Sequence, residues 1–291
     1  MSATDPSGLR AALRSTRALL LDLDGVIVVT GAAVPGSADA IAELEDRQFP
    51  YRIVTNTSAV SRDTLSRWSA KLGAAIPTAR FQSALSVSAA WSRRAFPDGP
   101  LYVLASEDAR QEFAGQWLLS HEEAGRRGAR AAAVIVGDSP EEATFDNLNR
   151  AFRLIRGGAL LVGMHRNPWW LTADGPTLDS GAYVAGLEFA AETRARVVGK
   201  PAATFFSAAV VDLRRQVGRD LGRADIAMIG DDVRTDIRAA QRVGLRGIFV
   251  LSGKHGPADV AAAAKERGGR RPDATALSLA HVVSALTAAL D

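Results

Sequence analysis

The chain has 291 residues, of which 47% are hydrophobic and 23% are charged, and these proportions are typical of a globular protein. Its formal net charge is only +3 and its arginines are scattered, so it lacks the basic stripe that nucleic-acid binding requires. Cysteine is absent, which excludes disulfides and thiolate metal sites. No apolar run approaches the ~20 residues of a membrane span, and the first residues lack the apolar core of a signal peptide. We therefore expect a cytoplasmic protein without nucleic-acid or membrane partners.

Short apolar runs alternate with helical patterns, and this alternation predicts parallel βαβ units. The runs expected as strands are 18–23, 52–55, 101–105, 132–136, 159–163, 226–230 and 247–251. Three segments between them place apolar residues on one helical face, namely Leu65, Trp68 and Leu72, then Phe145, Leu148, Phe152 and Ile155, and then Phe206, Val210, Leu213 and Val217. We expect an α/β fold with a Rossmann-like, doubly wound parallel sheet.

The first apolar run ends in two aspartates, Asp22 and Asp24, and Gly25 follows directly. A strand that is buried on both faces reads as continuous hydrophobics, and carboxylates enter such an interior only when they are paired or hold a metal. At the carboxyl end of the strand they face the crevice in which open α/β sheets bind ligands. Two acids one residue apart therefore suit an aspartyl nucleophile beside an acid/base and a divalent cation.

A second acidic cluster follows the strand expected at 226–230 and contains Asp231, Asp232 and Asp236. Mg²⁺ takes oxygen ligands, so one carboxylate from each cluster, together with a phosphate oxygen, is sufficient to hold it. Asp232 and Asp236 are four residues apart and share a face if a helix begins here. The alternative is an N-cap with first-turn acids that the helix dipole favours, and for Asp236 both interpretations stay open.

Two further segments carry groups that suit a phosphate. The strand at 52–55 ends in Thr55 and Asn56, whose hydroxyl and exposed amides can hold a phosphate oxygen, with an ordinary polar turn as the alternative. Lys200, one of only four lysines, stands between a glycine and a proline. Its ammonium can offset the charge of the carboxylates and a phosphoryl group, and the alternative is a solvated turn lysine.

The acid-rich strand ends lie near the two ends of the chain, at 22–24 and 230–236, whereas the middle has its own strands and helices without such a cluster. This distribution predicts a discontinuous core of residues 1–82 and 196–291. It also predicts an inserted α/β cap domain of residues 83–195.

Four motifs, in this order, resemble the haloacid dehalogenase superfamily of phosphohydrolases. They are Asp22-Leu23-Asp24-Gly25-Val26, Thr55-Asn56-Thr57-Ser58, Gly199-Lys200-Pro201 and Gly230-Asp231-Asp232-Val233-Arg234-Thr235-Asp236, and they extend over almost the whole chain. The insert between the second and third motifs resembles the subclass IIA cap of that superfamily. That cap occurs in phosphatases of p-nitrophenyl phosphate, phosphoglycolate, pyridoxal phosphate and nucleotides.

The resemblance implies a role for each acid of the first and last motifs. Asp22 is expected to attack phosphorus and become an aspartyl phosphate, while Asp24 protonates the leaving group and then activates water. Asp22, the backbone carbonyl of Asp24 and Asp231 are expected to bind Mg²⁺. Asp232 and Asp236 are expected to support the metal site and Lys200.

The same resemblance assigns the phosphoryl group to Thr55 and Asn56, with Lys200 neutralising charge. Because dehalogenases of this superfamily do not need a metal or an acid/base at the position of Asp24, its presence favours a phosphatase over a metal-independent dehalogenase. A non-catalytic module that binds a phosphorylated ligand on the same scaffold is the third hypothesis.

Segments of the cap and of the last third of the chain resemble the branch that contains phospholysine phosphohistidine inorganic pyrophosphate phosphatase. They include Phe145-Asp146-Asn147-Leu148, Leu178-Asp179-Ser180-Gly181 and Val197-Val198-Gly199-Lys200-Pro201. We therefore expect a small phosphorylated substrate, with phosphoamidates and pyrophosphate among the candidates, and a homodimer formed through the cap.

Five cap residues are candidates for substrate specificity: His165, Arg166, Asn167, Asp179 and Tyr183. Basic groups beside the aromatic pair Trp169 and Trp170 can close over a phosphate-bearing ligand. The favoured alternative for that aromatic pair is packing between cap and core or between two caps.

Overall fold

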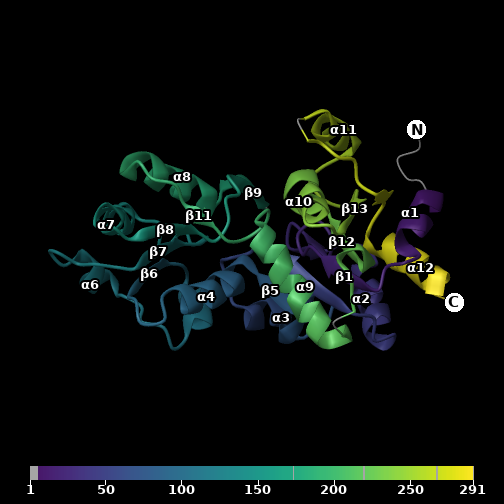
Figure 1. Cartoon of the computed structure of the whole chain (residues 1–291), viewed down its shortest axis with the longest axis horizontal. Coiled ribbons are helices and arrows are strands. Elements are labelled where there is room, and N and C mark those ends of the chain that lie inside the picture. The colour runs from purple at the N-terminus through teal and green to yellow at the C-terminus, as the bar shows by residue number, and fades with distance from the viewer. Residues whose placement is uncertain (1–5, 173, 219, 267, 291) are drawn as a thin grey trace. The chain divides into compact units, whose positions relative to one another are not determined.

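The computed structural model describes residues 6–172, 174–218, 220–266 and 268–290. The chain folds into two compact units. The first unit consists of the described residues within Met1–Thr55, Leu65–Gln82 and Lys200–Asp291, and the second of Asn56–Thr64 and Ser83–Gly199. Each unit contains a sheet of its own (Figure 1).

The sheet of the first unit has the strand order β14-β13-β12-β1-β4-β5. Its strands are β1 (Ala18–Leu21), β4 (Tyr51–Thr55), β5 (Phe81–Ser83), β12 (Ile226–Gly230), β13 (Arg246–Val250) and β14 (Ala274–Ala276). β1 pairs in parallel with β12 on one side and with β4 on the other. The chain continues from β1 toward β4 and from β12 toward β13, so the strand order changes direction between β1 and β12, where open α/β sheets bind ligands.

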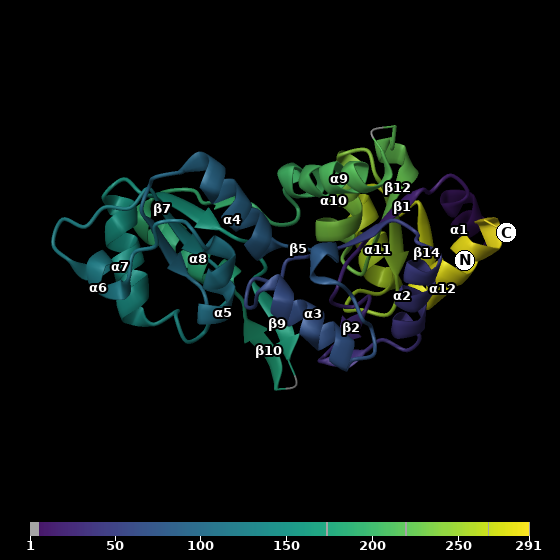
Figure 2. The same cartoon turned by 90° about the horizontal axis from the view of Figure 1, so that it is seen from below.

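Helices cover both faces of this sheet: α2 and α12 pack together on one face, and α9 and α10 pack together on the other (Figure 2). The helices are α1 (Pro6–Leu13), α2 (Ser37–Asp46), α3 (Arg62–Lys71), α9 (Ala203–Val217), α10 (Ala239–Arg242), α11 (Pro257–Lys265) and α12 (Leu279–Leu290). Shorter elements are the strands β2 (Val28–Val29) and β3 (Ala32–Ala33), the 3₁₀ turns Thr78–Arg80 and Arg223–Asp225, and a π-helix, η4 (Val233–Arg238). The core strands are buried on both faces, as their continuous hydrophobic sequences predict.

The sheet of the second unit has the parallel order β11-β8-β7-β6. Its strands are β6 (Leu101–Leu104), β7 (Ala133–Val136), β8 (Leu160–Gly163) and β11 (Arg196–Val197). Its helices are α4 (Ala84–Ala95), α5 (Glu107–Arg110), α6 (His121–Gly125), α7 (Phe145–Arg156) and α8 (Ser180–Ala191), and β9 (Trp169–Thr172) and β10 (Gly175–Leu178) form an antiparallel pair. Alternate strand residues pack against α7 and α8 on one face and against α4 on the other.

The predicted fold class is confirmed, and all seven predicted strands are present within two residues of the expected bounds. Two helix faces differ from the prediction. Leu65 is buried, but Trp68 is 52% exposed because α3 buries Leu65 and Ser69, four residues apart. Phe145 is 80% exposed because it opens α7.

The two compact units divide at 82/83, which is the predicted position, but they divide at 199/200 where 195/196 was predicted, and residues 56–64 lie outside the first unit. Residues 56–64 belong to the second unit, because hydrogen bonds such as that from Ser61 N–H to Asp108 hold them there. Residues 196–199 also belong to the second unit, because β11 pairs with β8. Among the described helices, none is long and apolar enough to span a membrane.

Candidate active site

The carboxyl ends of β1 and β12 bring the two acidic clusters together. Leu21 pairs in register with Ile229, and Asp22 N–H donates to the Ile229 carbonyl at 2.9 Å. The residues that follow the two strands, Asp22 and Asp231, therefore emerge side by side at the point where the strand order changes direction. Both are buried, with 7% and 4% exposure.

Lys200 forms ion pairs with carboxylates from both clusters. Its Nζ lies 2.7 Å from Asp22 Oδ1 and 2.7 Å from Asp236 Oδ1, and all three residues are buried. Asp22 Oδ1 also accepts the Leu23 N–H at 2.8 Å. Within the part of the chain that the structure describes, these contacts use Oδ1 and no hydrogen bond is made to Oδ2 of Asp22, which is therefore the oxygen available for chemistry.

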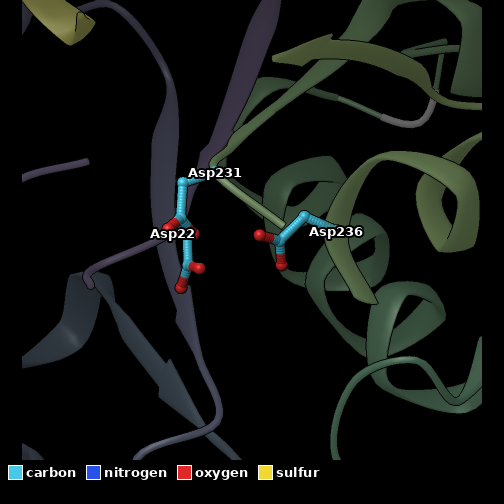
Figure 3. A group of neighbouring side chains, drawn as sticks. All are labelled: Asp22, Asp231 and Asp236. Atoms are coloured by element: carbon cyan, nitrogen blue, oxygen red, sulfur yellow. The ribbon is translucent and has the colours of Figure 1, made fainter. Parts of the chain in front are cut away.

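One carboxylate oxygen from each of Asp22, Asp231 and Asp236 lies within 4.8 Å of the others. Figure 3 shows the carboxyl group of Asp236 directed toward those of Asp22 and Asp231. Asp236 was predicted as a supporting residue, and the structure places it in the same cluster as two predicted metal ligands. Its position follows from η4, which begins directly after Asp232 and contains Asp236.

Two glycines allow Asp231 to occupy its position. A Cβ on Gly253 would lie 2.1 Å from Asp231 Oδ2, and a Cβ on Gly25 would lie 2.4 Å from the same oxygen. Gly25 also has a φ of +77°, which L side chains rarely adopt. Any larger residue at either position displaces the carboxylate.

The remaining acid of the second cluster, Asp232, caps η4 and pairs with Lys254. Its Oδ1 accepts the N–H groups of Arg234 and Thr235 at 2.8 and 2.9 Å, so Asp232 is an N-cap, which was the alternative interpretation of this cluster. Its Oδ2 lies 2.9 Å from Lys254 Nζ, while Lys254 N–H donates to Asp231 Oδ2 at 2.8 Å. Lys254 was given no role from the sequence. Its position after Gly253, as one of four lysines, was the available signal.

Burial and mutual repulsion shift the pKa values of these acids upward. Burial and then Asp236 raise the pKa of Asp231 to about 6, while burial and then Asp22 raise the pKa of Asp236 to about 8. Burial also raises the pKa of Asp22, although Lys200 opposes it. Burial favours a lower Lys200 pKa, but Asp22 and Asp236 outweigh this effect and raise it.

The donor set fits a hard divalent cation. Four buried carboxylates face two ammonium groups, so the ionised site carries excess negative charge. Repulsion between these carboxylates adds to the larger effect of burial in raising the pKa values of Asp231 and Asp236. Carboxylate oxygens are the ligands that Mg²⁺ prefers, and a cation between them relieves the repulsion.

The other predicted residues of the core motifs have different surroundings. Asp24, two residues after Asp22, has an exposed side chain. Thr55 is fully buried at the end of β4, and Asn56 is buried in the second unit. Lys200 is 3% exposed, so the solvated turn that was its alternative is wrong.

The five cap candidates occupy different positions within the second unit. His165 and Asp179 are buried, and Asp179 caps α8 by accepting the Ser180 N–H at 2.6 Å. Arg166 pairs with the buried Glu188 at 2.5 Å. Tyr183 packs partly buried against the hydrophobic cluster beneath α7 and α8. Asn167 is partly buried, and the side chains of Trp169 and Trp170 are about half exposed.

Comparison with protein families and curated proteins identifies relatives along the whole chain. A haloacid dehalogenase-like hydrolase model matches residues 19–116, and a HAD-hydrolase-like model matches residues 197–282. The haloacid dehalogenase-like hydrolase domain-containing protein 2 of Mus musculus is 34% identical over 275 residues, which cover 94% of this chain and 96% of that protein. The phospholysine phosphohistidine inorganic pyrophosphate phosphatase of Homo sapiens is 31% identical over 257 residues, covering 85% and 87%.

Comparison with solved structures gives the same fold. A glycerol phosphate phosphatase from Mycobacterium tuberculosis in complex with magnesium has a TM-score of 0.78 and 25% identity, and the match covers 93% of this chain and 77% of that chain. Both sheets of the present structure therefore belong to a known fold.

Replacing Gly253 tests whether the space around Asp231 matters for cation binding. We expect Gly253→Ala to weaken Mg²⁺ binding by about tenfold or more, because the new Cβ displaces a carboxylate that faces the cation. Gly256→Ala is the matched control, since its Cβ meets no atom within 4 Å. Isothermal titration calorimetry measures the Mg²⁺ affinity of the parent and of both variants. Equal affinities of Gly253→Ala and the parent would contradict the placement of Gly253 against Asp231.

The raised pKa of Asp231 gives a stability prediction with a defined sign. Because the folded pKa of about 6 exceeds the ordinary value of 3.8, the native state holds the proton more tightly, and stability is lost as the pH rises between these values. We expect metal-free Asp231→Asn to be more stable than the parent by on the order of 1 kcal/mol at neutral pH, with the difference shrinking toward the ordinary pKa.

Urea unfolding in EDTA measures this difference, and unfolding in excess Mg²⁺ provides the control. The parent gains stability from the cation, whereas Asp231→Asn gains little. A metal-free variant that is less stable than the parent at neutral pH would contradict the electrostatic interpretation.

Proposed function

The chain belongs to the haloacid dehalogenase superfamily of hydrolases, in which it is a phosphatase by homology. We propose that it hydrolyses a small phosphorylated metabolite with Mg²⁺ as cofactor, and that the reaction passes through an aspartyl phosphate on Asp22. The observation that carries this proposal is the state of Asp22. Lys200 and a backbone N–H hold its Oδ1, while Oδ2 is left to act as nucleophile beside Asp231. Burial raises the pKa of Asp22 and favours the protonated form, and the ammonium of Lys200 opposes this effect and favours the carboxylate that attacks phosphorus.

In the first half-reaction, Asp22 Oδ2 attacks phosphorus and the bond from phosphorus to the leaving oxygen breaks. Asp24 donates its proton to that oxygen, so the product leaves as a neutral alcohol. Its exposed side chain suits a group that must reach both substrate and solvent. When bound, Mg²⁺ supplies positive charge at the phosphoryl oxygens, and Asp22, Asp231 and the Asp24 carbonyl would hold it.

In the second half-reaction, Asp24 removes a proton from water, and the water oxygen attacks phosphorus. The bond between phosphorus and Asp22 breaks, inorganic phosphate leaves, and Asp24 is protonated again. Throughout, Lys200 holds Asp22 in place, and Thr55 and Asn56 bind the phosphoryl oxygens. Asp236 anchors Lys200 from the opposite side, and Asp232 fixes the start of η4.

The proposed substrates are phosphomonoesters, with phosphoamidates and pyrophosphate as further candidates. Support for the latter comes from the human relative whose name contains phospholysine, phosphohistidine and pyrophosphate. His165, Arg166, Asn167, Asp179 and Tyr183 stay proposed as the cap residues that set this choice. The homodimer stays a prediction as well.

Replacing the nucleophile tests the proposed chemistry. We expect Asp22→Asn to lower kcat for p-nitrophenyl phosphate by at least about 10³-fold, because an amide oxygen cannot form the phosphoenzyme. Asp46→Asn, an exposed aspartate of α2, should retain the parent rate.

The cation dependence separates the competing hypotheses. EDTA should abolish turnover of the parent, and added Mg²⁺ should restore it. Unchanged turnover by Asp22→Asn would exclude the proposed nucleophile. Insensitivity to EDTA would favour a dehalogenase, and phosphate-ester binding without turnover would favour a binding module.

A panel of phosphorylated metabolites tests the substrate class. We expect kcat/KM to be highest for one small phosphomonoester or phosphoamidate, because a cap distinguishes substrates by a few polar contacts. Release of inorganic phosphate is the measurement, with Asp22→Asn as the blank. Equal rates across phosphomonoesters, phosphoamidates and pyrophosphate would contradict selection by the cap.

A further inference from the structure

The segment after β4 is held by the second unit. Residues 56–64 directly follow the last core residue of β4, yet they belong to the second unit. Ser106 Oγ donates to the Ala59 carbonyl at 2.6 Å, and Asp108 accepts the Ser61 N–H at 2.7 Å. The conformation of this segment, which contains Asn56, is therefore determined by residues that are distant in sequence.

Ser58 is the most buried anchor of this segment, with 1% exposure. Its Oγ accepts the Asp138 N–H at 2.8 Å and lies 3.0 Å from His165 Nε2. A single hydroxyl thus joins the segment to residues that follow β7 and β8, at the carboxyl edge of the parallel sheet. That edge is where open α/β sheets bind ligands.

His165 connects this segment to the start of α8. The imidazole is 2% exposed, and its Nε2 lies 3.2 Å from Ser180 Oγ and 3.5 Å from Asp179 Oδ1. A Ser-His-Asp nucleophile requires the serine and the carboxylate on opposite ring nitrogens. Here both Ser58 and Asp179 face Nε2, so the group is a bridge and not a catalytic triad.

Asn56 is oriented by the same part of the second unit. Its Nδ2 donates to Asn167 Oδ1 at 3.4 Å, and the Asn167 N–H donates to His165 Nδ1 at 3.4 Å. His165 therefore touches the segment through Ser58 and also touches the residue that contacts the Asn56 side chain. A substitution of His165 therefore removes the contact with Ser58 and also the contact with Asn167, and both of these residues position Asn56.

We propose that His165 is a positioning residue: through Ser58 and Asn167 it holds Asn56 in the orientation that binds the phosphoryl group of the substrate. This inference rests on the proposed function, in which Asn56 binds that group. We expect Asn56 to bind the phosphoryl group equally in the ground state and the transition state, so loss of the bridge should weaken phosphate binding and leave kcat nearly unchanged. The bridge also makes phosphate affinity depend on His165, whose ring contacts Ser58, Ser180 and Asn167.

Two variants break the bridge from opposite ends. His165→Gln removes the ring, and Ser58→Ala removes a single oxygen, so the second tests the same contact if the first does not fold. His121→Gln is the matched control, because His121 also bonds within the second unit, to Tyr102 and Glu142. Near-UV circular dichroism checks the fold of each variant.

The measurements are KM and kcat for p-nitrophenyl phosphate and the calorimetric Kd of inorganic phosphate with Mg²⁺. We expect His165→Gln and Ser58→Ala to raise KM and Kd together by about fivefold to tenfold, with kcat within about twofold of the parent. His121→Gln should leave all three at parent values. In an Asn56→Ala background, neither variant should raise Kd further, because the bridge acts through Asn56.

Parent-like Kd values in the two folded variants, or effects that add fully to Asn56→Ala, would overturn the positioning role alone. If Asn56→Ala itself leaves Kd unchanged, the phosphate-binding role of Asn56 in the proposed function fails. The two failures are therefore distinguishable in one set of titrations.

Discussion

The organisation of the site depends on the two ion pairs that Lys200 forms with Asp22 and Asp236. The Lys200 ammonium lies 2.7 Å from Asp22 of the first acidic cluster and 2.7 Å from Asp236 of the second, in an interior where none of the three side chains is more than one tenth exposed. Removing one partner of such a buried pair leaves an uncompensated charge, which costs several kcal/mol. Even with Lys200 and Lys254 present, the carboxylates remain in excess. Burial, followed by repulsion from a neighbouring carboxylate, raises the pKa values of both Asp231 and Asp236.

The topology of the sheet explains why two acidic clusters separated by about two hundred residues can share a single cation. β1 and β12 are parallel neighbours, and the strand order changes direction between them. Loops that leave two such strands diverge, and Asp22 and Asp231 lie at the start of these loops. Glycines at 25 and 253 remove the side chains that would fill the space around Asp231. The pairing of β1 with β12 thus places Asp22 beside Asp231, and the two glycines leave space for the Asp231 carboxylate.

Much of the fold and of the first unit's acidic cluster could be predicted from sequence. Continuous hydrophobic runs identify the buried strands, and acids at their ends identify the edge where chemistry occurs. The remainder depends on tertiary contacts. The strand β14, Ala-Thr-Ala, is too short and too weakly apolar to be recognised, and the exposure of Phe145 depends on where α7 meets its sheet. The bridge between Ser58 and His165 joins residues 107 positions apart, so no local pattern contains it. The same holds for the segment 56–64, which adjoins a core strand in sequence but packs with the second unit.

We infer that excess buried negative charge next to Asp22 holds a divalent cation. Anomalous diffraction from crystals of the protein grown with Mn²⁺, which takes the same oxygen ligands as Mg²⁺, tests this inference. We expect an anomalous peak within coordination distance of one oxygen each of Asp22 and Asp231, with Lys200 still paired to Asp22. If crystals grown at saturating Mn²⁺ show no anomalous peak between these two aspartates, or show the ion bound only elsewhere, the inferred cation site is wrong.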